Sequence, residues 1–308
     1  MDNIVESSYV NDAFNAIVYI LTAFSLFWVG KRVYQLFHPT IDVQDELVIK
    51  DNFAFSIAHT GYFTGLLIAI GGSIVGESNG LIADIFDILI YGLLSILLLN
   101  MSIFINAKVI LRQFSVEKEI CVDRNEGTGL VEAASAIASG LVIFGAVSGD
   151  AIAPLWAMVD GSSDYLSYAP YMGIVNTLQY WFIGIVLMIF TAWFYNKILP
   201  YNALDEIEKD NVAVGFGFAG ALVAIAILVN HALMGDFESW TATFTKVGFE
   251  MLIGIILLPV ARYLTDKILL PGQNLTDELV NQEKANVGAG LIEAFSYIGG
   301  AILITWCI

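Results

Sequence analysis

The sequence predicts an all-α integral membrane protein with about eight transmembrane helices, arranged as two parallel four-helix repeats. Of the 308 residues, 57% are hydrophobic and only 14% are charged, and the mean hydropathy is +0.74. A water-soluble domain of this composition would expose large apolar patches. Eight apolar segments reach the roughly 20 residues that a helix needs to cross a bilayer. Recurring polar motifs in the two halves predict the duplication.

The predicted spans are bounded by polar or charged residues. A chain that crosses lipid must satisfy its own backbone hydrogen bonds, which favours helices here. The spans are expected at residues 13–36, 53–75, 82–110, 127–148, 172–198, 211–234, 241–269 and 287–307. The corresponding domains are a first repeat at 1–150, a periplasmic linker at 151–171 and a second repeat at 172–308.

Two pairs of motifs reveal an internal repeat. The second and sixth segments begin with KDNFA at 50–54 and KDNVA at 209–213. The fourth and eighth contain GLVEA at 129–133 and GLIEA at 290–294. Since each unit has an even number of spans, both copies should share one orientation in the membrane. We expect a pseudo-two-fold axis along the membrane normal to relate them.

These motifs resemble those of the YjfL-type inner-membrane family, which is known as a domain of unknown function. The similarity extends over nearly the whole chain. The resemblance implies a bacterial inner-membrane location, but it implies neither a substrate nor a reaction.

The distribution of basic residues predicts the orientation. Every lysine and arginine except Lys246 lies in or beside the connections after the first, third, fifth and seventh spans. Basic residues in short loops are retained in the cytoplasm. The other connections are acidic, as at Asp84 and Asp87. We therefore expect a multi-pass inner-membrane protein with both termini in the periplasm.

Several functional classes are disfavoured. A formal charge of -17 argues against a nucleic-acid partner, because phosphates require a basic surface. The two cysteines, Cys121 and Cys307, and three scattered histidines form no metal-ligand or disulfide pattern. Known catalytic motifs are missing from suitable elements. We expect no cofactor, no metal site and no enzymatic activity.

Glu132 and Glu293 are the leading candidate site residues. They occupy equivalent positions about two turns into the fourth and eighth spans, which are rich in small residues that let helices approach closely. We expect these spans at the centre of the fold, with the two carboxylates facing each other on the cytoplasmic side. Paired carboxylates attract a cation or a proton. The alternatives are hydrogen bonding to neighbouring helices, stabilisation by the helix start, or contact with a protein partner.

Weaker candidates lie at two helix starts. Asp51 and Asn52 are repeated as Asp210 and Asn211. Capping of free backbone N–H groups is the favoured role for them, and an ion site at the cytoplasmic mouth is the alternative.

Three further polar residues lie within spans and break the repeat. Glu250 aligns with a tyrosine, Asn100 aligns with a proline, and His59 has no histidine equivalent. The first two mark either a specialised path in one half or simple divergence. For His59, a hydrogen-bonded role in the core or at an interface is favoured.

The leading functional expectation is a channel or transporter for a small cation, a proton or a cationic metabolite. The alternative is a membrane scaffold or assembly subunit that binds a cytoplasmic protein partner through its short loops. Apart from the lipid bilayer, the expected partners are further copies of the chain in a homo-oligomer.

Overall fold

The computed structural model describes residues 2–75, 78, 80–148, 171–234, 239–270 and 272–308, and eight helices among them are long and apolar enough to cross a membrane. The all-α prediction is therefore confirmed. The long helices are α1 (Asp2–Phe37), α2 (Phe53–Gly72), α3 (Leu81–Val109), α5 (Glu126–Ser148), α7 (Tyr171–Ile198), α9 (Val212–Leu233), α10 (Trp240–Leu264) and α12 (Val287–Cys307). The predicted linker, 151–171, lies outside the described residues apart from Tyr171, at which α7 begins.

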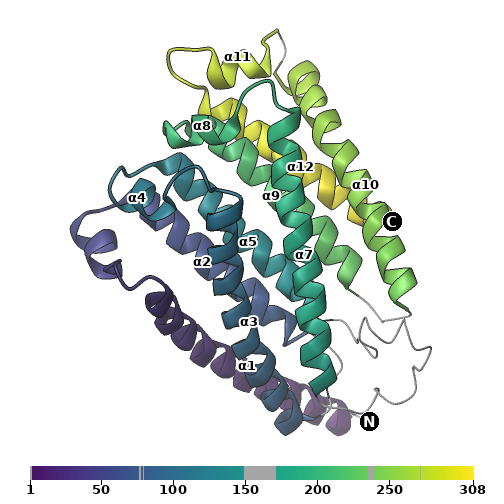
Figure 1. Cartoon of the computed structure of the whole chain (residues 1–308). Coiled ribbons are helices and arrows are strands. Elements are labelled where there is room, and N and C mark those ends of the chain that lie inside the picture. Colours follow the sequence, from purple (N-terminus) through teal and green to yellow (C-terminus); the bar gives the residue numbers. More distant parts are fainter. Residues whose placement is uncertain (1, 76–77, 79, 149–170, 235–238, 271) are drawn as a thin grey trace.

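Short elements join the long helices at one end of the molecule, which is the upper-left side in Figure 1. They are the helices α4 (Val116–Cys121), α8 (Ala203–Glu208) and α11 (Leu275–Val280) and the π-helical turns η1 (Asp45–Ile49) and η2 (Thr265–Leu269). This is the end at which the sequence places most of the basic residues.

Four helices form a row in the order α2, α5, α9, α12, and the other long helices pack around it (Figure 1). Glycines allow the close approach of neighbours within each repeat. A Cβ atom at Gly61 would overlap the backbone of Ala133, and one at its equivalent, Gly220, would overlap Ala294. Because matching ends of the helices touch, all four run in the same direction. The predicted common orientation of the repeats is confirmed.

The arrangement of the two repeats differs from the expected one. We predicted α5 and α12 at the centre, related by a pseudo-two-fold axis. The repeats instead meet through α5 and α9, and α12 lies at the end of the row opposite α2. This contact joins the last helix of one repeat to the second helix of the other, so it is heterologous and a two-fold axis does not describe it.

Each helix of the row begins with an asparagine cap. The Oδ1 atom of the asparagine accepts a bond from the backbone N–H three residues later, as predicted for Asn52 and Asn211. Asn125 and Asn286 make the same cap. Each Nδ2 atom donates to a glutamate of the preceding short element, namely Glu46, Glu119, Glu206 and Glu278, at 2.8, 3.1, 3.3 and 2.8 Å.

The caps also link each row helix to the next. Nδ2 donates to a backbone carbonyl of the short element before the following row helix: Asn52 to Ile120 at 2.9 Å, Asn125 to Ile207 at 2.7 Å and Asn211 to Leu279 at 2.8 Å. The row is thus held at this end by repeated side-chain to backbone bonds.

The aspartates before two of these caps play a different part from the one expected. Asp51 and Asp210 are not caps of their own helices, since the asparagine that follows each of them is the cap. Both aspartates adopt left-handed backbone angles, with φ of 49° and 61°. Asp210 instead accepts a bond, at 3.2 Å, from the backbone N–H of Gly127 at the start of α5. It therefore caps a helix of the other repeat.

Candidate cation site

Glu293 lies on α12 in a fully buried position and has an internal cationic partner. Arg262 on α10 forms an ion pair with it through Nη1, and Tyr297 donates a hydrogen bond to the same carboxylate oxygen at 2.8 Å. The Arg262 guanidinium also donates to Thr276 at 3.1 Å and lies 5.7 Å from the ring centre of Tyr201.

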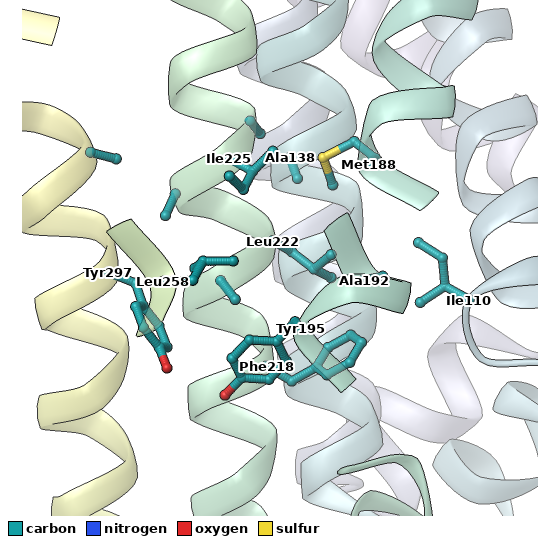
Figure 2. Packing of buried hydrophobic residues seen from close by; sticks show 14 of the residues in the cluster. Ile110, Ala138, Met188, Ala192, Tyr195, Phe218, Leu222, Ile225, Leu258 and Tyr297 are labelled. Carbon is teal, nitrogen blue, oxygen red and sulfur yellow. The ribbon is translucent and has the colours of Figure 1, made fainter. Parts of the chain in front are cut away.

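Aromatic rings enclose this ion pair on its inner side. Tyr195 on α7 and Tyr297 belong to the buried cluster in Figure 2, and their ring centres lie 5.8 Å apart. Gly217 on α9 leaves room for the carboxylate, because a Cβ at that position would overlap Glu293 Oε2. In the second repeat, the space around Glu293 is therefore filled, and its negative charge is balanced by Arg262.

The two repeats can be compared position by position in the region around Glu132 and Glu293. Asn106 on α3 donates to Ser135 on α5 at 2.8 Å, and Thr265 donates to Ser296 on α12, also at 2.8 Å. Thr265 is the repeat equivalent of Asn106 and Ser296 that of Ser135, as the motif alignment requires. Corresponding helices therefore pack in the same register.

In this register the first repeat lacks the two groups that contact the Glu293 carboxylate in the second, the guanidinium of Arg262 and the hydroxyl of Tyr297. Ile103 stands where the second repeat has Arg262, and Ala136 stands where it has Tyr297. Both residues line a cavity of 390 Å³ together with Glu132, the equivalent of Glu293. The first repeat thus has an open space where the second has a guanidinium and a phenol.

Two buried polar atoms of the residues that line this cavity are acceptors without donors in the described part of the chain. Glu132 forms no hydrogen bond or ion pair within the described residues, and its Oε2 atom is buried. Asn100 donates to Tyr62 at 3.2 Å and to the Ile96 carbonyl at 2.8 Å, but its buried Oδ1 atom has no donor in the same part of the chain. Buried acceptors without partners are costly. They would be satisfied by a ligand with N–H groups.

The cavity reaches the end of the molecule that carries the short helices. Its lining there includes His38, Lys108, Arg112 and Glu117. Burial lowers the pKa of the His38 imidazole, which therefore stays neutral at neutral pH. The two basic side chains and the acidic one are exposed at this rim, where water weakens their interactions. Glu132 is the acidic group that a spanning helix contributes to the lining.

The predicted pairing of the two glutamates is wrong. Glu293 binds Arg262, and α9 separates α5 from α12. Composition could not reveal this, because Arg262 is one of many basic residues near the end that carries the short helices. The missed signal is the loss of the repeat at two positions, Arg262 against Ile103 and Tyr297 against Ala136.

Of the weaker candidates, Asn100 lines the cavity together with Glu132. The capping asparagines Asn52 and Asn211 and the aspartates before them lie instead at the end of the molecule that carries the short helices. Glu250 accepts a hydrogen bond from His231 Nδ1, with distances of 3.0 and 3.1 Å to its two oxygens. It precedes Arg262 by about three helical turns, or roughly 18 Å along α10. Glu250 is therefore not part of either glutamate site.

His59 is buried among aromatic rings rather than hydrogen-bonded as expected. Its ring centre lies 4.8 Å from that of Tyr34, 5.2 Å from that of Phe55 and 4.8 Å from that of Phe63. Its Nδ1 atom has no partner within the described residues. Across the same part of the chain, histidine, cysteine and carboxylate side chains form no group of three that could hold a metal ion.

The fold and site define a polytopic helical membrane protein built from two diverged copies of one four-helix unit. The family described as Domain of Unknown Function (DUF350) matches the chain twice, at residues 8–147 and 169–308. The chain belongs to this family, as a tandem duplication, and it is an inner-membrane protein.

Individual relatives agree with this assignment. The chain is similar to the UPF0719 inner membrane protein YjfL of Escherichia coli K12, with 24% identity over 133 residues, or 42% of this chain and 89% of that protein. The YjfL protein of Escherichia coli O157:H7 matches to the same extent. One repeat thus corresponds to nearly the whole of such a relative. No solved structure matches the chain.

The two glutamates should respond oppositely to neutralisation. Glu293→Gln leaves Arg262 buried without its counter-charge, which should lower the free energy of unfolding by about 3–5 kcal/mol. Glu132→Gln removes a carboxylate that has no such partner, so stability should be unchanged or higher. Unfolding of both variants in mixed detergent micelles measures the difference.

Arg262→Leu combined with Glu293→Gln supplies the control. Since it removes both charges of the pair, it should recover much of the stability that Glu293→Gln loses. Equal losses for Glu132→Gln and Glu293→Gln would contradict the difference between the two sites.

Proposed function

We propose that the chain binds a small cation at Glu132 and carries it, or a proton, across the inner membrane as a channel or transporter. The observation that carries this proposal is the contrast between the repeats. Glu293 has a built-in guanidinium partner, whereas the equivalent Glu132 faces a cavity. An ionisable group within a membrane span is a functional candidate by default, and it usually faces the protein interior or water.

Arg262 indicates the chemistry of the expected ligand. In the second repeat a guanidinium occupies the place that is open in the first. A free cation with N–H donors could satisfy both Glu132 and Asn100, which face the same cavity. Guanidinium and primary ammonium groups meet this requirement, and the neighbouring Tyr34 and Tyr62 rings suit their apolar parts. A proton would neutralise Glu132 without filling the cavity.

The proposed orientation places the cavity mouth in the cytoplasm and both termini in the periplasm. Its support is the concentration of basic residues at the end with the short helices. We further propose that the working form is a homo-oligomer and that the chain has no catalytic role.

Neutralising Glu132 should weaken cation binding. We expect purified protein to bind methylguanidinium or methylammonium, measured by isothermal titration calorimetry. Glu132→Gln should weaken that binding by about 10–100-fold, the equivalent of one charge-assisted hydrogen bond. Ile103→Arg should abolish it, because it places a side chain like Arg262 in the cavity. Flux of the same cations into proteoliposomes should fall in parallel.

Glu293→Gln, provided that it folds, is the matched control and should bind like the unaltered chain. Proton flux that is lost in Glu132→Gln, without binding of either organic cation, would identify the proton as the cargo. Equal binding and equal flux in the unaltered chain and Glu132→Gln would refute a role for this carboxylate. Absence of all binding and flux, together with stable co-purification of a cytoplasmic protein, would favour the scaffold.

Cysteine labelling should report the orientation. Val122, beside α4, is 70% exposed, so Val122→Cys in a chain without other cysteines should react with a membrane-impermeant maleimide only after the membrane is opened. Val75→Cys, beyond the other end of α2, should react in intact cells. The reverse pattern would invert the orientation.

The native Cys121 is a poorer reporter, because burial raises the pKa of its thiol to about 11. Only the thiolate attacks a maleimide. Its labelling rate should therefore rise about tenfold per pH unit above neutrality, while that of Val122→Cys should level off near the ordinary thiol pKa of ~8.5.

A further inference from the structure

We infer that copies of this chain assemble head to tail, with α12 of one copy packed against α2 of the next in the way that α5 packs against α9 within the chain. This inference is independent of the proposed cation site. It rests on groups at the two ends of the helix row that lack the partners which their repeat equivalents have.

The contact between repeats is the template. A Cβ on Gly215 of α9 would come within 3.0 Å of Gly127 on α5 near the helix starts. Near the helix ends, a Cβ on Gly145 would lie 3.0 Å from the Asn230 carbonyl oxygen and 3.2 Å from Leu233 Cβ. The Asn230 side chain donates to the Leu141 carbonyl at 2.8 Å. The two helices are therefore in contact along their whole length.

The cap of α12 lacks one bond that the other caps make. Asn52, Asn125 and Asn211 each donate to a carbonyl of the short element that precedes the next row helix. For Asn286, the only Nδ2 bond within the described residues is to Glu278. The next row helix would be α2 of another copy, and the short element before it is η1.

The exposed position of η1 agrees with this missing bond. The motif alignment pairs Val48 of η1 with Ile207 of α8, whose carbonyl receives the bond from Asn125. Ile207 is fully buried against α5, whereas Val48 is 72% exposed. A second copy with its Asn286 beside η1 would bury Val48 as Ile207 is buried.

A second polar pair is incomplete in the same way. Asp210 accepts from the Gly127 N–H at the start of α5. The equivalents of these two residues are Asp51 and Gly288, on opposite ends of the row. Both are exposed, and Asp51 has the same left-handed backbone as Asp210 but no bonded partner in the described part of the chain. Head-to-tail packing would bring Asp51 to the start of the neighbouring α12.

The apolar faces follow the same pattern. Val142 of α5 is fully buried, but its equivalent on α12, Leu303, is 59% exposed. On α7, which crosses the junction of the repeats, Ile185 is 3% exposed, whereas its equivalent on α1, Phe24, is 67% exposed. Exposed apolar side chains are ordinary in lipid. Leu303 and Phe24 are informative because their repeat equivalents are buried where the two repeats of the chain meet.

Side-chain sizes at the far ends of α12 and α2 are complementary. Within the chain, the small Gly145 lies against the larger Asn230. At the outer ends, the large Trp306 replaces Gly145 and the small Gly71 replaces Asn230. The large and small positions are exchanged, so the outer contact would again pair a glycine with a larger side chain.

This packing is heterologous, so it closes into a ring or continues as an open row. All row helices run in the same direction, and each added copy would be related to the one before it by the same movement within the membrane plane. A rotation about the membrane normal that divides the full circle evenly would close such an arrangement into a ring.

Disulfide cross-linking between chosen cysteines tests the inference. In a chain without Cys121 and Cys307, Ser56→Cys and Gly288→Cys reproduce the Gly215–Gly127 contact. Ile74→Cys and Trp306→Cys reproduce the Leu233–Gly145 contact, whose spacing approaches that of a disulfide. Membranes that contain two differently tagged single-cysteine variants, one of each pair, should give a cross-linked dimer with both tags. Chains with both cysteines should give a ladder of higher oligomers.

Gly248→Cys on α10, where a Cβ would meet open space, is the control and should not cross-link to Ser56→Cys. The two pairs lie at opposite ends of the helices, so one suffices if a variant of the other does not fold. Cross-linking of a single-cysteine variant to itself would indicate a two-fold dimer and overturn the inference. Failure of both pairs in folded protein would overturn it as well.

Discussion

The close approach of four parallel helices is the constraint on which the rest of this structure depends. Glycines at Gly61 and Gly220 let neighbouring backbones touch. At the short-helix end, asparagine side chains satisfy the first turn of one helix and a carbonyl of the next short element. Lipid offers no hydrogen bonds and no hydrophobic force between helices, so dense packing and satisfied polar groups must hold the row together.

Within this common frame the two repeats have diverged at a few positions. The second repeat places Arg262 and Tyr297 on the buried Glu293, whereas the first retains Glu132 but has Ile103 and Ala136 around it. A carboxylate kept without its counter-charge carries an energetic cost. The first repeat keeps both the carboxylate and the space beside it, which supports binding there and a structural role for the second site.

Much of the fold could be predicted because membrane spans and repeats leave strong local patterns. Apolar length predicted the eight helices, and the repeated Asn52 and Asn211 predicted two caps. The arrangement of the repeats could not be predicted, because small residues on α5 and α9 are equally suited to several neighbours. The candidate sites could be predicted only in part. The repeated motif pointed to Glu132 and Glu293, but the partner of Glu293 lies on another helix. The cavity beside Glu132 depends on Ile103 and Ala136, which are smaller than the Arg262 and Tyr297 of the second repeat.

The most direct test of this account is an experimental structure of the protein in lipid nanodiscs with methylguanidinium. The account predicts non-protein density within hydrogen-bond distance of Glu132 and Asn100, and none beside Glu293, which should contact Arg262. Density at neither glutamate would contradict it, and so would a side chain of the protein itself paired with Glu132.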